Sequence, residues 1–391
     1  MKIVFYCQHV LGIGHLFRSI EFCRALARHQ VILITGGPGT DAALPPHVTE
    51  ARLPALEMDR EFQGLRAGAG ADLEGIRRMR REHLMTLFEV ARPDLFLVEL
   101  YPFGRKAFRF EIDPVLEAMA AGRLPHGGVV CSVRDILVEK KDPGTHEARA
   151  VSVLNRFFDA VLIHADPRLV RLEETFSRLN EVTVPLVYTG FITPTPAADA
   201  RQRLRTALGL TAADRLIVVS AGGGSVGMPL LEAAVRAARS LKPARKTLVQ
   251  VFTGPFLPER DFQQLTRAAG EGTVVARFTS DFLSYLAAAD LSVSMAGYNT
   301  TMNLLAARVP ALVWPFAQNH EQRLRSERLE RRGALQLLAD ADLEPARLAA
   351  LMDRRLEHPG RPEAGLDLDG AQAAARWIDA WRPPAGRRRT P

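Results

Sequence analysis

The residues best suited to chemistry form two glycine-rich turns in the second half of the chain. A Gly-Gly-Gly-Ser motif at residues 222–225 comes directly after the apolar run at residues 216–219. Gly297 follows a second apolar run at residues 291–294 and precedes a stretch with helical spacing. Glycine allows a ligand to approach the backbone closely, and the N–H groups at a helix N-terminus attract anions. Two such turns in one half of the chain predict a site for a nucleoside diphosphate.

His15 and Glu99 are the candidates for acid–base chemistry in the first half. His15 follows a glycine turn after the first apolar run, and an imidazole titrates close to neutral pH. Glu99 ends an apolar run, so we expect it at the carboxyl end of a strand, where it can orient a substrate or accept a proton. Two structural alternatives stay open. His15 would then only pack at a helix start, and Glu99 would only form an ion pair with Arg105 or Lys106.

Apolar runs of strand length alternate with helical stretches, which is typical of α/β proteins with parallel sheets. The expected strands of the first half are residues 2–6, 31–35, 95–99, 129–133, 161–164 and 184–188. Those of the second half are residues 216–219, 247–252, 274–277, 291–294 and 311–314. A Thr-Pro-Thr-Pro motif at residues 193–196 has the composition of a linker. We therefore expect two Rossmann-like, doubly wound parallel-sheet domains that face a cleft, with ligands at the carboxyl ends of the strands.

The composition limits the classes of function. The chain of 391 residues is 47% hydrophobic, which is enough for two cores, and no apolar run reaches the ~20 residues that span a bilayer. We interpret the N-terminus as a strand and not as a signal peptide, so we expect a cytoplasmic location. The formal charge of +7 lies entirely after residue 195, and no pattern of a nucleic-acid partner is present. Cys7, Cys23 and Cys131 form no close pair, which indicates buried thiols.

Three motifs follow one another along the chain: Gly-Ile-Gly-His at residues 12–15, Gly-Gly-Gly-Ser at 222–225, and Ala-Gly-Tyr-Asn-Thr-Thr at 296–301. Pro310, Pro315 and the pair Glu321-Gln322 come after the third motif. Together they resemble the glycosyltransferases of the two-domain GT-B fold, and within them family 28, the MurG-like enzymes. The segments 98–105, 131–137 and 187–191 are similar to a subgroup of predicted glycosyltransferases with unassigned substrate. The resemblance covers most of the chain.

The resemblance implies transfer of a sugar from a nucleotide diphosphate sugar, with UDP as the expected nucleotide, to an acceptor hydroxyl. It also implies inversion at the sugar and no metal or other cofactor, because backbone N–H groups and a helix dipole stabilise the leaving diphosphate. The acceptor would be a small molecule, a lipid-linked molecule or a polysaccharide. Peripheral contact with the inner face of the membrane fits the family. The arginines within residues 77–81 would make this contact or bind an anionic acceptor, or else form a solvated helix face.

The family pattern also assigns domains and site residues. Residues 1–190 would bind the acceptor, 191–199 would be a hinge linker, 200–370 would bind the donor, and 371–391 would hold a helix that packs back on the first domain and a basic tail. The catalytic positions fall on His15 and Glu99, and the acceptor side has Gly12, Gly14 and Asp135. The donor-binding positions are Gly222, Gly223, Gly224, Ser225, Phe278, Gly297, Asn299, Thr300, Asn303, Glu321 and Gln322. Structural interpretations stay open for some of them: an Arg134–Asp135 pair, a core position for Phe278, and helix capping by Asn299 and Thr300.

Asn303 departs from the family pattern, which has a glutamate there that binds the ribose hydroxyls. An amide still bonds a hydroxyl but carries no charge, so the strength of donor binding is an open question. Two alternatives to sugar transfer remain, the first because the same fold and loops serve other enzymes and the second because of Asn303. One is a nucleotide-sugar hydrolase or epimerase of the same fold, and the other is a non-catalytic nucleotide-sugar binding protein.

Overall fold

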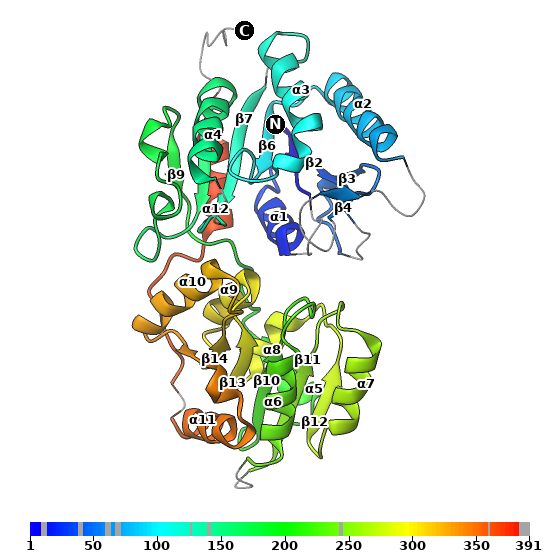
Figure 1. The fold of residues 1–391 in the computed structure, drawn as a ribbon. Helices are drawn as coiled ribbons and strands as arrows, with labels where there is room; N and C mark the ends of the chain where they lie inside the picture. The colour runs from blue at the N-terminus through cyan, green and yellow to red at the C-terminus, as the bar shows by residue number, and fades with distance from the viewer. Residues whose placement is uncertain are drawn as a thin grey trace. The chain divides into compact units, whose positions relative to one another are not determined.

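The computed structural model describes residues 1–8, 14–37, 42–58, 64–66, 72–125, 127–138, 142–241, 245–358 and 360–382. The chain forms two compact units (Figure 1). The first unit comprises Met1–Ile192 and Asp367–Pro391, and the second comprises Thr193–Leu366. Each unit has one large parallel sheet with helices on both faces, so the predicted pair of Rossmann-like domains is confirmed.

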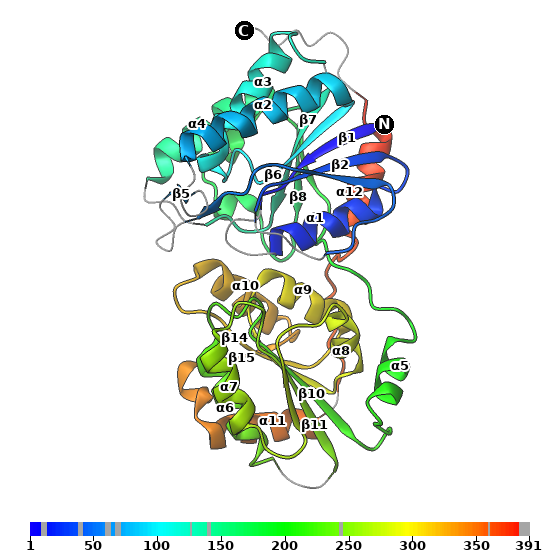
Figure 2. The same ribbon diagram turned by 90° about the vertical axis from the view of Figure 1, so that its right-hand side faces the viewer.

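The first unit is built on a sheet with the strand order β3-β2-β1-β6-β7-β8-β9, in which every pair of neighbours is parallel. These strands are β1 (Lys2–Tyr6), β2 (Gln30–Thr35), β3 (Val48–Arg52), β6 (Leu95–Glu99), β7 (Gly128–Arg134), β8 (Ala160–His164) and β9 (Leu186–Tyr188). A separate antiparallel pair joins β4 (Glu57–Met58) and β5 (Leu65–Arg66). The helices are α1 (Gly14–Ala25), α2 (Leu73–Ala91), α3 (Arg109–Ala120), α4 (Pro143–Phe157) and α12 (Gly370–Ala380). Figure 2 shows α2, α3 and α4 on one face of the sheet and α1 and α12 on the other.

The apolar runs predicted the central strands of this sheet well. Every residue of β6 and β8 is buried, as expected for parallel strands that have helices on both faces. The edge strand β3 was missed because its sequence Val-Thr-Glu-Ala-Arg buries only Val48 fully and therefore has no apolar run. The three cysteines are free and buried, which confirms their interpretation as buried thiols.

The second unit repeats this architecture with the strand order β12-β11-β10-β13-β14-β15, again with parallel neighbours throughout. The strands are β10 (Arg215–Ser220), β11 (Thr247–Phe252), β12 (Thr273–Ala276), β13 (Leu291–Met295), β14 (Ala311–Trp314) and β15 (Gln336–Leu337). The helices are α5 (Ala200–Ala207), α6 (Met228–Ala238), α7 (Glu259–Ala268), α8 (Phe282–Ala288), α9 (Tyr298–Ala307), α10 (His320–Arg331) and α11 (Pro345–Glu357). Of these, α6, α7 and α11 lie on one face and α5 and α8 on the other (Figure 2).

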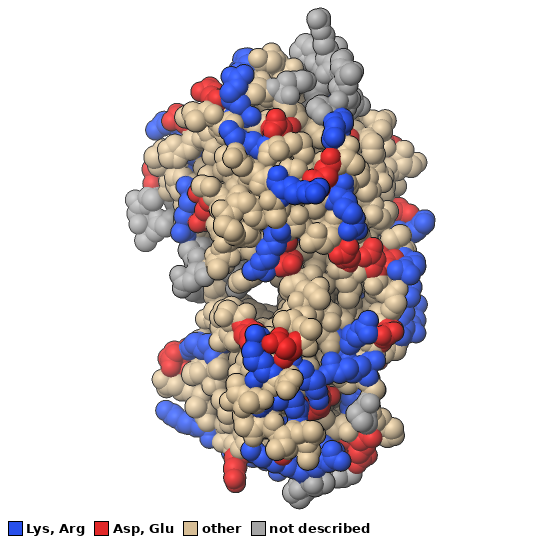
Figure 3. Space-filling model, turned by 180° about the vertical axis from the view of Figure 1, so that it is seen from behind, with Lys and Arg blue, Asp and Glu red and all other residues tan. Residues whose placement is uncertain are grey.

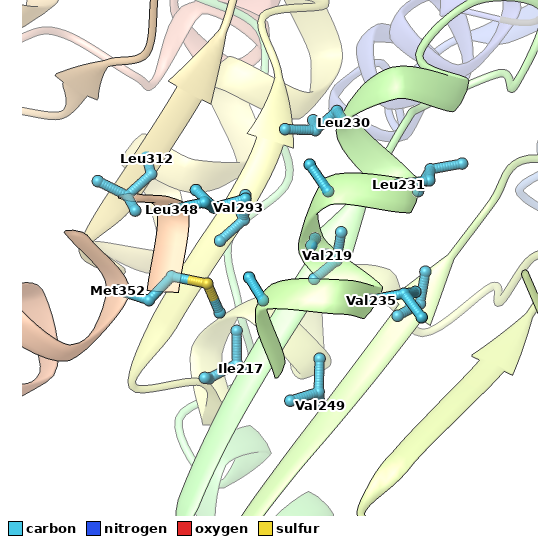
Figure 4. Packing of buried hydrophobic residues seen from close by; sticks show 14 of the residues in the cluster. Ile217, Val219, Leu230, Leu231, Val235, Val249, Val293, Leu312, Leu348 and Met352 are labelled. Carbon is cyan, nitrogen blue, oxygen red and sulfur yellow. The ribbon is translucent and has the colours of Figure 1, made fainter. Parts of the chain in front are cut away.

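The core of the second unit lies between its sheet and the helices α6 and α11 (Figure 4). Ile217, Val219 and Val293 of the strands belong to one cluster with Leu231 of α6 and Met352 of α11, and all five side chains are fully buried. Burial of apolar surface contributes about 25 cal/mol per Å². This core holds the carboxyl ends of β10 and β13 next to each other, and the two glycine turns begin there.

The chain returns to the first unit after residue 366, which differs from the predicted domain limits of 199/200 and 370. Backbone hydrogen bonds cause the difference: the N–H of Phe191 donates to the carbonyl oxygen of Asp367, and the N–H of Gly370 donates to that of Phe191. Ile192 and Asp369 also form a β-bridge. Residues 367–370 thus belong to the first unit, and 193–199 belong to the second. The helix α12 packs on α1 and buries Ala374 and Ile378 in the core of the first unit.

The arginines of α2 do not form one solvated face. Arg80 is fully buried and its guanidinium donates to both oxygens of Glu111 at 2.7 Å. It also donates to the side chain of Gln8 and to the carbonyl oxygen of Pro54. On the face of the protein in Figure 3, Lys and Arg side chains are interspersed with Asp and Glu. No helix in the described part of the chain is both long and apolar enough to cross a membrane.

Candidate functional site

The two glycine turns of the second unit lie side by side. They follow β10 and β13, which are neighbours in the sheet with Ser220 opposite Ser294. Thr300, in the first turn of α9, connects them: its Oγ1 lies 3.8 Å from where a Cβ on Gly222 would sit and 3.9 Å from that of Gly297. The positive end of the α9 dipole and the Gly-Gly-Gly-Ser backbone therefore meet at one place, as the binding of a diphosphate requires.

The three glycines of the Gly-Gly-Gly-Ser motif have different reasons to be glycine. Gly222 and Gly224 have φ values of +66° and +86°, which L-residues with a side chain rarely adopt. A Cβ on Gly224 would also lie 2.5 Å from the carbonyl oxygen of Thr253. Gly223 has neither constraint, because a Cβ there would only touch the ring of Phe256 at 3.5 Å. The fold thus explains two of the glycines, whereas neither φ nor a close backbone contact requires glycine at position 223.

This difference gives a matched pair of variants. We expect Gly223→Ala to weaken nucleotide binding by about 10- to 100-fold, since one charge-assisted hydrogen bond is worth ~1.5–3 kcal/mol. The melting temperature of the free protein should stay nearly unchanged. Gly224→Ala should instead destabilise the protein by at least ~1–2 kcal/mol, because it places a side chain at positive φ. Calorimetric titration and thermal unfolding of both variants separate the two effects, and a Gly223→Ala protein with normal affinity contradicts the ligand role.

The other residues predicted for the donor side lie after β12 and on α9. Phe278 follows β12 and is 52% exposed, so its alternative as a core residue is wrong. Gly297 is the N-cap residue of α9 and has no side chain to cap the helix, and Asn299 and Thr300 lie in the first turn. The Oδ1 atom of Asn303 accepts a hydrogen bond from the Thr193 hydroxyl at 3.3 Å.

Glu321 and Gln322 occupy the first turn of α10. The Gln322 side chain accepts a hydrogen bond from the N–H of Phe316 at 3.1 Å, and its own N–H donates to the side chain of Asn319, the N-cap residue. Gln322 therefore ties the start of α10 to the segment after β14. Beside it lies a pocket of about 320 Å³ that is lined by Ser225, Met228, Leu257, Trp314 and Phe316 among others. This pocket connects the Gly-Gly-Gly-Ser turn with the residues around Gln322.

In the first unit the structure brings His15 and Glu99 together. The Nδ1 atom of His15 lies 2.6 Å from Oε1 of Glu99, and the histidine side chain is 23% exposed whereas that of Glu99 is 1% exposed. Glu99 also forms ion pairs with Arg18 at 2.6 Å and Arg105 at 2.8 Å. The predicted alternative, a Glu99–Arg105 ion pair, is thus present together with the histidine contact. Sequence reasoning missed Arg18, although its spacing of three from His15 on one helix face was a usable signal.

The charges around Glu99 determine its protonation and that of His15. Burial alone would raise the pKa of Glu99, but His15, Arg105 and Arg18 together lower it well below its usual range. Burial lowers the pKa of His15 to about 3, with Arg105 and Arg18 acting in the same direction and Glu99 opposing them. Nδ1 of His15 lies 2.6 Å from the Glu99 carboxylate, which can only accept, and 3.1 Å from the Arg18 guanidinium, which can only donate. The shorter contact with the ionised carboxylate favours a proton on Nδ1, which leaves the lone pair on Nε2. This is the arrangement of a general base oriented by a carboxylate.

Of the three residues predicted for the acceptor side, the structure describes two, Gly14 and Asp135. Gly12 lies outside the described residues, and Gly14 is the first residue of α1. Asp135 directly follows β7, the strand next to β6, and is fully buried. The thiol of Cys7 is buried at the end of β1, the strand next to β6. Burial raises the pKa of this thiol to about 12, so it is a poor nucleophile at neutral pH.

A second buried histidine gives an expected pH dependence of stability. The ring of His164 forms hydrogen bonds with the hydroxyl groups of Ser132, through Nε2 at 2.7 Å, and Thr189, through Nδ1 at 2.8 Å. Burial lowers the pKa of His164 to about 3. An unfolded histidine has a pKa of about 6.5, so the stability contributed by the neutral ring is complete above that pH and is lost as the pH falls toward 3. We expect the free energy of unfolding to fall with a slope of up to ~1.4 kcal/mol per pH unit for His164, with His15 adding to it. Urea unfolding at pH 7, 6 and 5 measures this slope, and His164→Asn should reduce it. Equal stability at pH 5 and pH 7 would contradict neutral burial.

Comparisons with known proteins relate the chain to a class of enzymes. Residues 217–369 match the Glycosyltransferase family 28 C-terminal domain. A UDP-N-acetylglucosamine–N-acetylmuramyl-(pentapeptide) pyrophosphoryl-undecaprenol N-acetylglucosamine transferase from Symbiobacterium thermophilum is 26% identical, over 93% of this chain and 92% of the relative. The calicheamicin glycosyltransferase CalG4 superimposes with a TM-score of 0.60 at 16% identity, over 98% of this chain and 99% of that one. MurG of Acinetobacter baumannii gives a TM-score of 0.56 at 16% identity, over 97% and 100% of the two chains.

The two Rossmann-like units and these structural neighbours define the GT-B fold. Residues 217–369 match the C-terminal domain of glycosyltransferase family 28, and the chain is similar over most of its length to a MurG-like enzyme. It is therefore an enzyme of nucleotide-sugar glycosyl transfer, and the hydrolase, epimerase and binding-protein alternatives are not favoured.

Proposed function

We propose that the enzyme transfers a sugar from a UDP-sugar to an acceptor hydroxyl, with inversion and without a metal ion. The observation that carries this proposal is the meeting of the two glycine turns at Thr300. The diphosphate would lie over Gly223 and the N-terminus of α9, where backbone N–H groups stabilise the charge that develops on the leaving UDP. The name of the relative from Symbiobacterium thermophilum supports a UDP-sugar as donor.

The sugar and the base would extend from the diphosphate in opposite directions. The pocket beside Ser225 and Phe316 supports a place for the sugar near Gln322, whose side chain bonds that segment. The base would lie near Phe278, which is exposed at the end of β12. Asn303 would contact a ribose hydroxyl through its amide N–H groups while Thr193 holds its Oδ1.

The acceptor would bind to the first unit, with His15 as the general base. The acceptor oxygen forms a bond to the anomeric carbon while the bond from that carbon to the diphosphate oxygen breaks. Nε2 of His15 takes the hydroxyl proton, and Glu99 stabilises the resulting imidazolium through Nδ1–H at 2.6 Å. The acceptor class stays open between a small molecule and a lipid-linked molecule, since the two kinds of relative have names of each type. If the acceptor is lipid-linked, the enzyme would also contact the cytoplasmic face of the membrane peripherally.

A donor screen tests this proposal on the full-length protein. We expect UDP-sugars to raise the melting temperature, because a ligand at ~100 times its dissociation constant stabilises by about 2.7 kcal/mol. Release of UDP in the presence of an acceptor mixture should continue after addition of a chelator. Activity that a chelator abolishes and magnesium or manganese restores would contradict the metal-free mechanism, and stabilisation by another nucleotide alone would contradict UDP.

A further inference from the structure

The segment from Glu99 to Arg105 has an unusual backbone. Four non-glycine residues of the described ranges have a positive φ: Arg92, Leu100, Arg105 and Arg308. Arg92 and Arg308 are the C-cap residues of α2 and α9, where this left-handed conformation is common. Leu100 (φ +66°) and Arg105 (φ +59°) end no helix and bracket the loop after β6. A bulky residue in this conformation is strained, and such strain collects at functional sites.

The two left-handed residues turn the chain back, so that Arg105 reaches Glu99. The N–H of Gly104 donates to the carbonyl oxygen of Leu100 at 2.7 Å and closes the turn. The Arg105 guanidinium donates to Oε2 of Glu99 from Nε at 3.2 Å and from Nη2 at 2.8 Å. The strained backbone thus places a guanidinium, on a side chain that is only 8% exposed, on one oxygen of the carboxylate.

The loop is anchored by contacts that do not involve this carboxylate. Phe103 is 2% exposed and packs edge-on against the ring of Phe176, with the ring centroids 4.9 Å apart. Its carbonyl oxygen accepts a hydrogen bond from Nε2 of His146 at 3.0 Å. Tyr101 is 1% exposed, and its hydroxyl donates to the carboxylate of Asp113. The loop is therefore held in place before a substrate arrives, as a preorganised catalytic site requires.

The other oxygen of Glu99 is the one that meets the proposed base. Oε1 lies 2.6 Å from Nδ1 of His15 and accepts from Nη2 of Arg18 at 2.6 Å. A carboxylate is planar, so a fixed Oε2 limits the rotation that would turn Oε1 away from the ring. Two N–H groups of a rigid, planar guanidinium fix an oxygen better than a single ammonium group does. Arg105 thus restricts the direction in which Glu99 faces His15.

We propose that Arg105 is a positioning residue for the proton transfer, which holds Oε2 of Glu99 so that Oε1 stays aimed at Nδ1 of His15. The inference rests on the proposed function, because it takes His15 as the base. Arg105 touches no reacting atom: the hydroxyl proton goes to Nε2, and the proton on Nδ1 stays hydrogen-bonded to Glu99. The arginine acts through geometry, and a displacement of about 1 Å at a catalytic group costs up to ~100-fold in rate.

Proton NMR of the full-length protein with isotopically labelled histidine observes the Nδ1–H group of His15 without any ligand. A short hydrogen bond to a carboxylate moves the signal of this proton far downfield, and its absence in His15→Gln assigns the signal. Arg105→Lys keeps the positive charge beside Glu99 but cannot place two rigidly spaced N–H groups on one oxygen. We expect the signal to move upfield in this variant or to broaden through exchange.

The rate should change together with the signal. In Arg105→Lys, kcat for UDP release with the acceptor mixture should fall by about 10- to 100-fold. The KM for the UDP-sugar should change by less than about twofold, because the proposed donor contacts belong to the other unit. Arg24→Lys is the matched control, since Arg24 is 54% exposed and pairs with Glu21 on the same helix as His15. It should leave the signal and kcat as in the wild type.

Phe103→Leu is a second variant, which keeps every charge and replaces Arg105→Lys should that protein not fold. It loosens the anchor of the loop and should change the signal and kcat in the same direction by a smaller factor. Wild-type signals and rates in both variants would show that Arg105 does not position Glu99. The inference is also wrong if kcat falls only with the folded fraction, measured by thermal unfolding, while the signal stays unchanged. A wild-type protein that transfers no sugar from a UDP-sugar would instead refute the proposed function, and the NMR signal would still show whether Arg105 holds the pair.

Discussion

His15→Ala should lower kcat by roughly 10²–10⁴, which is the usual contribution of a general base. The imidazole has its Nδ1 2.6 Å from Glu99, its pKa lowered to about 3, and its side chain partly exposed, so a neutral Nε2 is available at physiological pH. Donor affinity should remain close to that of the wild type, because the proposed donor contacts belong to the other unit. Steady-state kinetics with a saturating donor, together with a calorimetric titration of UDP, measure both quantities.

The pH profile provides a second check of this role. A histidine with a pKa of about 3 stays neutral between pH 5 and pH 8, so kcat/KM of the wild type should show no inflection near 6.5 from this group. A normal rate for His15→Ala would reject His15 as the base, and Glu99 would then take this role if Glu99→Gln were inactive while still folded.

Glu99→Gln should destabilise the first unit by about 3–5 kcal/mol, because it leaves Arg18 and Arg105 buried without their counter-charge. The side chains of these arginines are only 5% and 8% exposed, and both are within 2.8 Å of the carboxylate. The amide keeps the shape of the side chain, so the loss measures the charge. Urea unfolding followed by a probe in the first unit gives the value.

An exposed ion pair is the matched control for this variant. Glu74 pairs with Arg77 on α2, but the two side chains are 75% and 33% exposed. Glu74→Gln should therefore change the free energy of unfolding by no more than ~0.5 kcal/mol. An equally small effect of Glu99→Gln would mean that water or another group compensates the arginines.

The sequence predicted the parts of this protein that depend on local patterns. Apolar runs identified the central strands, and the glycine turns were located because each follows such a run directly. The strand β3 escaped because an edge strand needs no apolar run, and its residues 49 to 52 are not buried. The glycine turn before His15 and the strand end at Glu99 were local patterns too, but no local pattern connects these two residues.

Contacts between distant segments were beyond what the sequence could give. Arg18 meets Glu99 across 81 positions, and Thr193 meets Asn303 across 110. Phe256 has no signature at all, since an isolated phenylalanine after a strand is usually a core residue. Only the backbone hydrogen bond from Phe256 to Gly223 and the contact of its ring reveal that it lies beside the Gly-Gly-Gly-Ser turn.

The return of residues 367–380 to the first unit affects the order of events at the ribosome. Domains generally fold during translation as they emerge, with the N-terminal one first. Here the second unit is one continuous segment, Thr193–Leu366, whereas the first unit lacks α12 until the last part of the chain has been made. Until then the apolar surface of α1 that α12 covers stays open, since Ala374 and Ile378 are not yet there to bury it. The second unit can thus complete its fold before the first, and a stop codon near residue 366 would damage the half of the protein that was synthesised earliest.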